Sequence, residues 1–405
     1  MEDSRPTTTQ VNSGVNILAI IVFFIIFIPS SFHPVINSIS LYILIPILFL
    51  YSVIKNPRLI VNYKPLTYLL LLFCWSLITM IKSKDLGISL REIRQLVGVF
   101  FLCCIFVRYC FVNPKYIYIF YILYILKFFT LFYYGYTHGL LVTDKRFSLE
   151  ELNANMFGYF GFFSVVSAFF LWQSLQHNFL LKISSFVLFW LCLSLSVVTC
   201  FYAASRAGIA ISVLMATSLI AIYFFYPFSK KAIIGIILLI AISVAIIPVL
   251  DFYYEGSILE RRFQIESVQN ESRYVLAKRA IVVGFQNPMF GVGPGNYRLY
   301  NLDTKLSHSS YTELFANNGI IALIIFLSLL YYFYKRNRYL FSSVKNCIKD
   351  AMYFLSYLIL FALYNVFYPF YLQLFLMGFF YIVMVHMEIF IISKEIPENQ
   401  PGETL

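Results

Sequence analysis

The chain has 405 residues, of which 60% are hydrophobic, 20% aromatic and only 12% charged. An ordinary soluble domain carries about 25% charged residues, so this composition excludes that class and indicates that lipid surrounds much of the chain. The net charge of +11 does not indicate a nucleic-acid partner, because most Lys and Arg lie in short connectors between apolar runs, as in polytopic membrane proteins.

Apolar runs long enough to cross a membrane recur along the chain. A helical span needs about 20 apolar residues, and this criterion predicts an all-α, polytopic membrane protein with about twelve transmembrane helices. The spans are expected at 16–33, 38–54, 65–81, 95–112, 116–136, 155–176, 181–202, 207–227, 231–250, 319–334, 351–367 and 370–392. Nine helices thus fall in 1–250 and three in 319–392, with a large loop at 251–318 and a polar tail at 393–405.

The connectors predict the orientation. An even number of spans puts both termini on one side, and a cytoplasmic location for them places most connector Lys and Arg inside, Lys55 and Lys335 among them. The outside connectors at 34–37 and 368–369 carry no Lys or Arg. The positive-inside rule therefore predicts that the 251–318 loop lies outside, which is the periplasm in a Gram-negative organism.

One predicted outside connector, 82–95, breaks this rule because it carries Lys82, Lys84, Arg91 and Arg94. Arg91 and Arg94 would share a face if the segment is helical. Two interpretations remain open, a solvated interfacial turn and a site for an anion.

A second unusual charge is Arg206, which stands alone between two apolar runs in the sequence YAASRAG at 202–208. An ionisable group at membrane depth is a functional hypothesis by default. The alternative is an Arg whose long side chain only reaches out to the interface. The small residues around Arg206 would let a substrate or backbone approach closely.

The segment 251–319 is the one long hydrophilic stretch, with seven acidic and seven basic residues. Within it, Asn270 or Ser272 can cap a helix from Arg273 to about Gly284, and Asn287-Pro288 would stop that helix. The sequence GVGPGN at 291–296 predicts a tight turn. Its spacing differs from a Walker motif, so a turn close to a ligand and a cradle for phosphate both remain open.

His308 is expected at the start of a helix that descends into the membrane. On that helix His308, Thr312 and Phe315 would share a face, whereas Glu313 lies about 140° around and would not partner His308. A structural hydrogen-bonding role and a functional role are both open, and the arginines of the loop favour the functional one.

Together these residues suggest one reaction type. Arg side chains bind phosphate through fixed donors, and His can take or position a hydroxyl proton near neutral pH. The sequence therefore suggests that an alcohol attacks a carbon whose leaving group is a lipid-linked phosphate or diphosphate. The seven Cys show no metal-ligand spacing, and no carboxylate cluster indicates a metal. The residues of this predicted site are Arg91, Arg94, Arg206, Arg273 and His308.

Three motifs resemble the O-antigen ligase/polymerase superfamily of polytopic glycan-transfer proteins. His308 and Ser309, followed by nine residues and Gly319, match most of the pattern described for its ligase branch. The sequences NPMFGVGPGNY at 287–297 and SRAG at 205–208 resemble its loop segment before the His and its short Arg-containing turn.

The resemblance implies transfer of an undecaprenyl-diphosphate-linked glycan without metal, nucleotide or other cofactor. His308 would orient or deprotonate the acceptor hydroxyl, Arg206 and Arg273 would hold the diphosphate, and Arg91 and Arg94 would assist. The implied location is the bacterial inner membrane, with the active site facing the periplasm. The implied partners are the lipid-linked glycan, the bilayer and a chain-length regulator protein.

The two branches of the superfamily differ in the acceptor. Polymerases transfer the growing chain to another lipid-linked repeat unit, and ligases transfer it to lipid A–core. The last position of the ligase pattern is Ala322 here, where Gly, Thr or Tyr is expected, and HSSYTELFANNG at 308–319 looks more like polymerase sequences. A polymerase is therefore favoured, with a ligase as the alternative.

A transporter or flippase for lipid-linked sugars is the alternative from another functional class. Such proteins are often built from two similar halves with interrupted helices in corresponding positions. This sequence shows no such symmetry, and its charge is concentrated in one loop.

Overall fold

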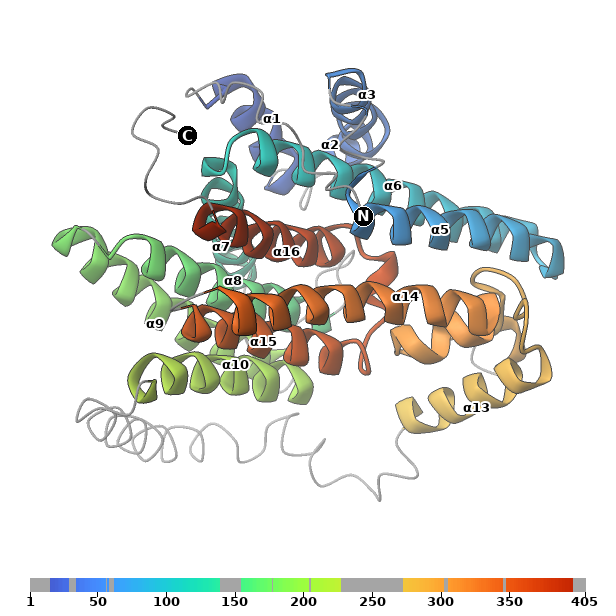
Figure 1. Cartoon of the computed structure of the whole chain (residues 1–405). Helices are drawn as coiled ribbons and strands as arrows, with labels where there is room; N and C mark the ends of the chain where they lie inside the picture. The colour runs from blue at the N-terminus through green and yellow to red at the C-terminus, as the bar shows by residue number, and fades with distance from the viewer. Residues whose placement is uncertain are drawn as a thin grey trace. The chain divides into compact units, whose positions relative to one another are not determined.

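The structure is a computed structural model that describes residues 15–28, 34–55, 57, 62–138, 154–176, 178–203, 205–226, 272–301, 305–344 and 347–395. All regular elements in these ranges are helices, which confirms the all-α class (Figure 1). Nine helices of the described ranges are long and apolar enough to cross a membrane, so the chain is a polytopic membrane protein. The predicted span 231–250 and the loop residues 251–271 lie outside the described residues, and the total of twelve spans stays a prediction.

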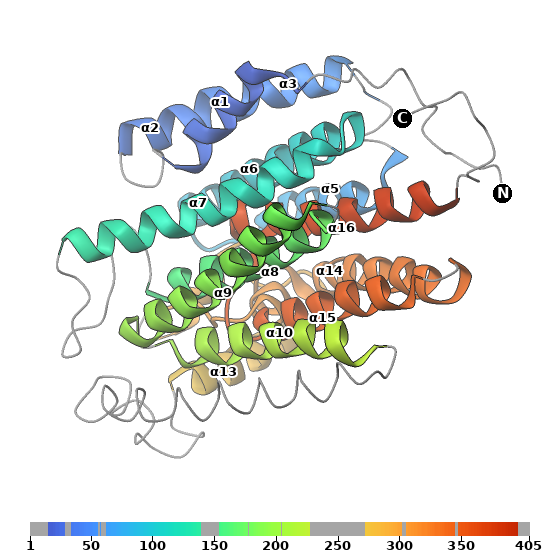
Figure 2. The ribbon, with the colours of Figure 1, turned by 90° about the vertical axis from the view of Figure 1, so that its left-hand side faces the viewer.

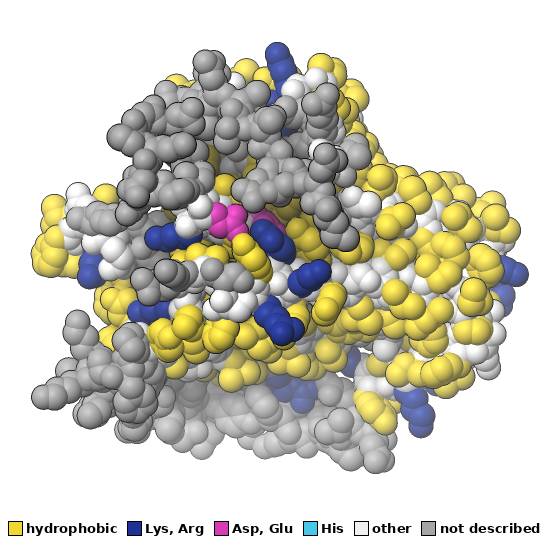
Figure 3. Space-filling view, in the orientation of Figure 1, with side chains coloured by type: hydrophobic (Ala, Val, Ile, Leu, Met, Phe, Trp, Pro, Cys, Tyr) yellow, Lys and Arg dark blue, Asp and Glu magenta, His cyan; other side chains and the backbone are white. Residues whose placement is uncertain are grey.

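The chain divides into two compact units. The first contains residues 1–117, 266–344 and 361–405, and the second contains 118–265 and 345–360. Hydrophobic side chains cover much of the face shown in Figure 3, with Lys and Arg as separate groups among them. Such a surface suits helices that face lipid.

The first unit holds the N-terminal helices, the described part of the large loop and the C-terminal helix. Its helices are α1 (Ile17–Phe27), α2 (Pro34–Ile39), η2 (Ser40–Leu44), α3 (Ile45–Lys55), α5 (Lys64–Thr79), η3 (Met80–Lys82), α6 (Leu86–Val112), α13 (Ser272–Gln286), η5 (Asn296–Tyr300), α14 (Ser310–Ser343), η6 (Phe370–Leu372) and α16 (Leu374–Glu395). Helix α6 packs against α3, α5 and α16, and α14 packs against α5 and α13.

The second unit contains α8 (Ala154–Ser174), α9 (Phe179–Tyr202) and α10 (Arg206–Phe225), which contact one another in pairs and lie side by side in Figure 2. Most of α7 (Lys115–Thr137) and α15 (Ile348–Tyr364) also belongs to this unit. Aromatic rings fill its core. Phe169 meets Tyr353 edge-on at 4.7 Å, and Tyr121 stacks on Phe170 at 5.7 Å. Such contacts add to the apolar burial that holds helices together.

The predicted 82–95 connector is wrong in its extent, because α6 begins at Leu86 and runs unbroken for 27 residues. The Asp85 carboxylate caps this helix by accepting the N–H of Ile88 at 3.1 Å. Arg91 and Arg94 therefore lie on a helix and not in a turn. Hydropathy did not show this start because the first helical turns are more polar than the span that follows.

The helix expected to run from His308 into the membrane is interrupted by a sharp reversal at Gly319, the predicted start of the tenth span. Gly319 has φ 76° and ψ −175° inside α14, a combination that only glycine adopts readily. The rings of Tyr311 and Phe326 lie 5.9 Å apart, although 15 residues of straight helix would separate them by about 22 Å. Residues 310–318 therefore fold back along the helix that follows Gly319.

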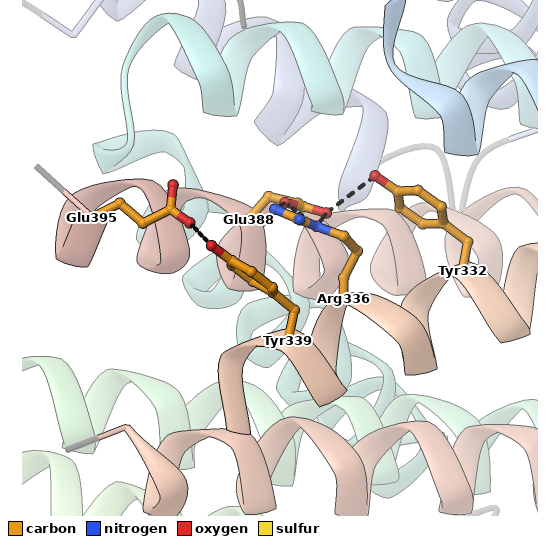
Figure 4. A network of polar contacts seen from close by, with 5 residues as sticks. All are labelled: Tyr332, Arg336, Tyr339, Glu388 and Glu395. Carbon is orange, nitrogen blue, oxygen red and sulfur yellow. Dashed lines mark hydrogen bonds and ion pairs between the residues drawn. The ribbon is translucent and has the colours of Figure 1, made fainter. Parts of the chain in front are cut away.

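At its other end α14 continues to Ser343, well past the predicted boundary at 334. Basic residues expected in a cytoplasmic connector thus lie on the helix. One of them, Arg336, forms a two-pronged ion pair with Glu388 of α16, at 2.8 Å from Nε to Oε1 and 2.6 Å from Nη2 to Oε2 (Figure 4). Tyr332 donates to the same carboxylate at 3.3 Å, and Tyr339 donates to Glu395 at 2.6 Å.

Candidate functional site

The Gly-rich segment 291–296 forms the tight turn predicted for it. Gly291, Gly293 and Gly295 have φ of 64°, 93° and 68°, which lie in the left-handed region. At Gly293 a side chain is excluded by space as well, because a Cβ there would lie 2.2 Å from Ser83 Oγ. The turn therefore rests directly on the short connector between α5 and α6.

Asn296 fastens this turn to the beginning of α6. Its amide donates to Ser89 Oγ at 2.7 Å, and its carbonyl oxygen accepts the N–H of Asp85 at 2.8 Å. Ser89 in turn donates to the carbonyl of Pro294 at 2.8 Å. All three contacts are made by buried or half-buried groups, so each fixes the turn more firmly than an exposed hydrogen bond would.

Tyr297 connects the turn to α13 and to α14. Its hydroxyl donates to the carbonyl of Leu276 on α13 at 2.5 Å, and its N–H donates to Asn317 Oδ1 on α14 at 2.7 Å. Burial raises the pKa of Tyr297 to about 12, so the hydroxyl stays a neutral donor at physiological pH. The ring is fully buried in a cluster with Ala280, Val283 and Ala316.

Glu313 joins this network to the segment before α14. Its Oε1 accepts from Asn317 Nδ2 at 3.0 Å, and its Oε2 accepts the backbone N–H of Ser307 at 2.6 Å. Glu313 is fully buried, and a buried carboxylate needs such donors. The carboxylate thus fixes the residue that directly precedes His308.

His308 lies in the bend between Ser307 and α14, not on the helix. It has φ 59°, and among the described non-glycine residues it alone has a positive φ. The predicted helical face of His308, Thr312 and Phe315 is therefore wrong, since the helix begins only at Ser310. A non-glycine residue in the left-handed region is uncommon and often marks a functional site.

The residues after His308 are fixed as tightly as those before it. The Ser310 hydroxyl donates to Asn365 Oδ1 at 2.6 Å and accepts the N–H of Phe370 at 2.8 Å. The Ser310 N–H donates to the Asn365 carbonyl at 2.8 Å. With Glu313 holding Ser307, both flanks of His308 are anchored, and the half-buried imidazole is presented from a rigid bend.

A second buried carboxylate, Glu92 of α6, lies against the same Gly-rich turn. Its Oε1 accepts from the hydroxyl of Tyr371 at 3.0 Å. A Cβ on Gly295 would lie 2.6 Å from its Oε2, so the turn and the carboxylate are in close contact. Glu92 thus contacts the turn directly, whereas Glu313 is linked to it through Asn317.

Arg91 and Arg94 lie on the exposed face of α6, on the side away from Glu92. The Arg94 guanidinium lies 5.8 Å from the centre of the Tyr42 ring on η2, within the range of a cation–π contact. The helix confirms that the two arginines share a face. Whether they bind an anion stays a prediction.

Arg273 lies in the first turn of α13, which confirms the predicted helix after 272 and its end before Asn287-Pro288. Its side chain is half-buried. Leu276, one turn further along α13, accepts from Tyr297. A continuous chain of hydrogen bonds therefore runs from the Arg273 helix through Tyr297, Asn317 and Glu313 to the residue before His308.

Arg206 is the first residue of α10 and belongs to the second unit. Ser205 caps this helix by accepting the N–H of Gly208 at 3.3 Å. A Cβ on Gly208 would meet Cys200 Sγ at 2.8 Å, so helices pack closely here. The side chain of Arg206 is half-buried.

The predicted site residues are thus distributed over both units. Arg91, Arg94, Arg273 and His308 belong to the first and Arg206 to the second. The meeting of all five at one site stays a prediction. Sequence reasoning did not identify the buried residues that organise the first unit, because they lie in segments that hydropathy marks as polar. They are Glu92, Asn296, Tyr297, Glu313 and Asn317.

A comparison with models of known protein families gives a match. The family model described as O-antigen ligase matches residues 191–327, about a third of the 405-residue chain. A search of curated proteins finds no match. The family match does not separate polymerases from ligases. Together with the polytopic all-α fold, it supports the assignment of this chain to the O-antigen ligase/polymerase superfamily.

Proposed function

We propose that this protein polymerises undecaprenyl-diphosphate-linked repeat units of O-antigen, or of a similar surface polysaccharide, at the periplasmic face of the inner membrane. The growing glycan leaves its lipid carrier and is joined to a second lipid-linked repeat unit. The reaction is a metal-independent glycosyl transfer with the lipid diphosphate as leaving group.

In the proposed step, an acceptor hydroxyl oxygen attacks the anomeric carbon of the donor sugar. The new C–O glycosidic bond forms while the bond from that carbon to the diphosphate oxygen breaks. The hydroxyl proton passes to the imidazole of His308, and the electron pair of the broken bond leaves with undecaprenyl diphosphate. Arg206 and Arg273 stabilise the charge that develops on the diphosphate, and Arg91 and Arg94 assist.

One observation carries this proposal. The matched range 191–327 contains Arg206, Arg273 and His308, the three residues to which the resemblance assigns catalytic roles. The structure adds support because His308 stands in a strained bend with anchored flanks, as a positioned acid or base requires.

The ligase remains the second candidate, since the family model carries its description. A ligase would use the same donor and the same leaving group, but its acceptor would be lipid A–core. Ala322 at the last motif position and the sequence after His308 favour the polymerase.

A strain that lacks the gene separates these functions. Loss of a polymerase leaves lipid A–core that carries a single repeat unit. Loss of a ligase leaves bare core, and polymer accumulates on the lipid carrier. Loss of a flippase, the less favoured transporter function, also leaves bare core, but without polymer on the carrier. Electrophoresis of the lipopolysaccharide together with analysis of the carrier-linked glycan therefore distinguishes all three.

A further inference from the structure

The predicted outside loop contains an unusually apolar stretch. From Ala280 to Tyr297 the sequence carries no charged residue. Three of its large side chains are well exposed, namely Val282 at 49%, Phe285 at 71% and Met289 at 53%. An exposed apolar cluster of this kind in a segment outside the membrane needs a partner that covers it.

Helix α13 packs on α14 mainly through other side chains. Leu276, Ala280 and Val283 are buried, and Ala280 and Val283 lie in one cluster with Ala316 of α14. The Phe285 ring meets Phe315 of α14 edge-on, with ring centres 5.3 Å apart, yet Phe285 stays 71% exposed and Val282 stays 49% exposed. Helix α13 therefore keeps exposed apolar surface that α14 does not cover.

Contacts with α5 give the depth of this stretch in the membrane. The Phe290 ring stacks on Trp75 of α5, with ring centres 5.5 Å apart and planes at 16°. Helix α5 and the turn after it form a candidate span, Lys64–Lys82. Trp75 lies seven residues before Lys82, which places it about 10 Å inside the end of that span.

Contacts with residues around Gly319, at the start of the tenth span, place residues 288–290 at the same depth. The N–H of Ile320 donates to the carbonyl of Pro288 at 2.8 Å, and Trp75 Nε1 donates to the carbonyl of Asn318 at 2.8 Å. Residues 288–290 therefore lie beside Trp75 and the Gly319 reversal, both of which belong to candidate spans. A freely hydrated loop would not lie at this depth.

The neighbouring surface of α5 is apolar and exposed. Leu71 and Ile78, one turn before and one turn after Trp75, are exposed at 48% each. Side chains at this spacing share one face of a helix. Phe290 packs against the same face and therefore extends this exposed apolar surface of the span.

We propose that residues 285–290 lie in the outer leaflet of the bilayer and contact its acyl chains through Phe285, Met289 and Phe290. The large loop is thus partly embedded, and the embedded part carries the Gly-rich turn and His308 at a fixed depth. Lys278, exposed on α13 before this stretch, has a flexible stem that lets its ammonium reach lipid phosphates. This inference does not depend on the reaction proposed above.

Tryptophan fluorescence tests this inference on the full chain in phosphatidylcholine bilayers with and without bromine on the acyl chains. Phe285→Trp and Met289→Trp each add one indole to the three native tryptophans, whose signal is subtracted with the unsubstituted protein. Tyr300→Trp is the matched control. Tyr300 is exposed, and the centre of its ring lies 4.0 Å from the ammonium of Lys84. Lys84 belongs to the connector between α5 and α6.

The added fluorescence at 285 and 289 is expected to lose most of its intensity in brominated bilayers and to resist aqueous iodide. The added fluorescence at 300 should show the opposite behaviour. Quenching of 285 and 289 by iodide would overturn the inference, because these positions would then face water. Resistance to both quenchers would also overturn it, because protein would then cover the surface. Agreement between the two variants shows that neither result comes from a local misfolding.

Discussion

The carboxylate of Glu313 accepts the backbone N–H of Ser307 at 2.6 Å, one residue before the left-handed bend at His308. Its other oxygen accepts from Asn317, which also binds the N–H of Tyr297 in the Gly-rich turn. Glu313 therefore couples the position of His308 to the turn. It is a positioning residue, since it acts on His308 through the backbone of Ser307.

Glu313→Gln is expected to lower polysaccharide synthesis about 10- to 100-fold. The amide keeps the shape of the side chain but offers one acceptor oxygen, so either Ser307 or Asn317 loses its acceptor. A hydrogen bond to a charged group contributes about 1.5–3 kcal/mol, and each 1.4 kcal/mol corresponds to about tenfold in rate. The rate of polymer formation in membrane vesicles measures the effect.

Glu395→Gln is the matched control, because Glu395 is exposed and contacts Tyr339 at the far end of α16. It should leave the rate unchanged. The pH dependence of the rate separates positioning from mere folding, since a displaced His308 would titrate in a different environment. A Glu313→Gln variant with the normal rate and pH profile would contradict the positioning role.

Gly319→Ala is expected to destabilise the protein by about 3 kcal/mol or more. A Cβ at Gly319 would lie 2.1 Å from the carbonyl oxygen of Met289, and φ 76° already disfavours a side chain. The reversal that brings Tyr311 to Phe326 would open. The midpoint of thermal unfolding in detergent measures the loss of stability.

Gly87→Ala serves as the control for this substitution. Gly87 is exposed in the first turn of α6, and the nearest atom to an added Cβ is the flexible Asp85 carboxylate at 3.2 Å. Ala is a better helix former than Gly by up to about 1 kcal/mol, so the unfolding midpoint should stay or rise slightly. Equal effects of the two substitutions would argue against a strained reversal at Gly319.

Single substitutions of Arg336 and of Glu388 should lower the stability of the protein by unequal amounts. The Glu388 side chain is only 6% exposed, whereas that of Arg336 is 30% exposed. Arg336→Leu leaves a buried carboxylate without its main partner and is expected to cost about 3 kcal/mol. Glu388→Leu leaves a guanidinium that water can reach, so it should cost less.

The double variant Arg336→Leu/Glu388→Leu should be more stable than Arg336→Leu alone, because no unpaired charge is then buried. Thermal unfolding of the four proteins provides the double-mutant cycle. Strictly additive effects would show that the pair does not couple α14 to α16. No loss of glycan transfer is expected beyond that caused by lower protein levels.

Much of the fold follows from hydropathy because a bilayer demands long apolar runs. The predicted span 116–136 corresponds to α7 and the span 181–202 to α9, each within a few residues. The helix that begins near 272 was predicted to within a residue, and its stop at Asn287-Pro288 follows from the constraint that Pro places on the residue before it.

The reversal at Gly319 and the bend at His308 were not predictable in the same way. An Asn-Asn-Gly sequence is compatible with a continuing helix, and only the approach of the Met289 carbonyl excludes a side chain at Gly319. Likewise, the distance of Glu313 from His308 along a regular helix suggested no relation between them. The two are linked because Ser307 and His308 lie before the helix and turn back toward the carboxylate.

Complementation of a strain that lacks this gene tests the central claim most directly. The deletion strain should show lipid A–core with a single repeat unit, and the unsubstituted gene should restore long chains. His308→Ala should reach the membrane in the same amount and restore no chain longer than one unit, because the acceptor hydroxyl loses its base. A normal ladder of chain lengths with His308→Ala, or bare core in the deletion strain, would contradict the proposed polymerase with His308 at its centre.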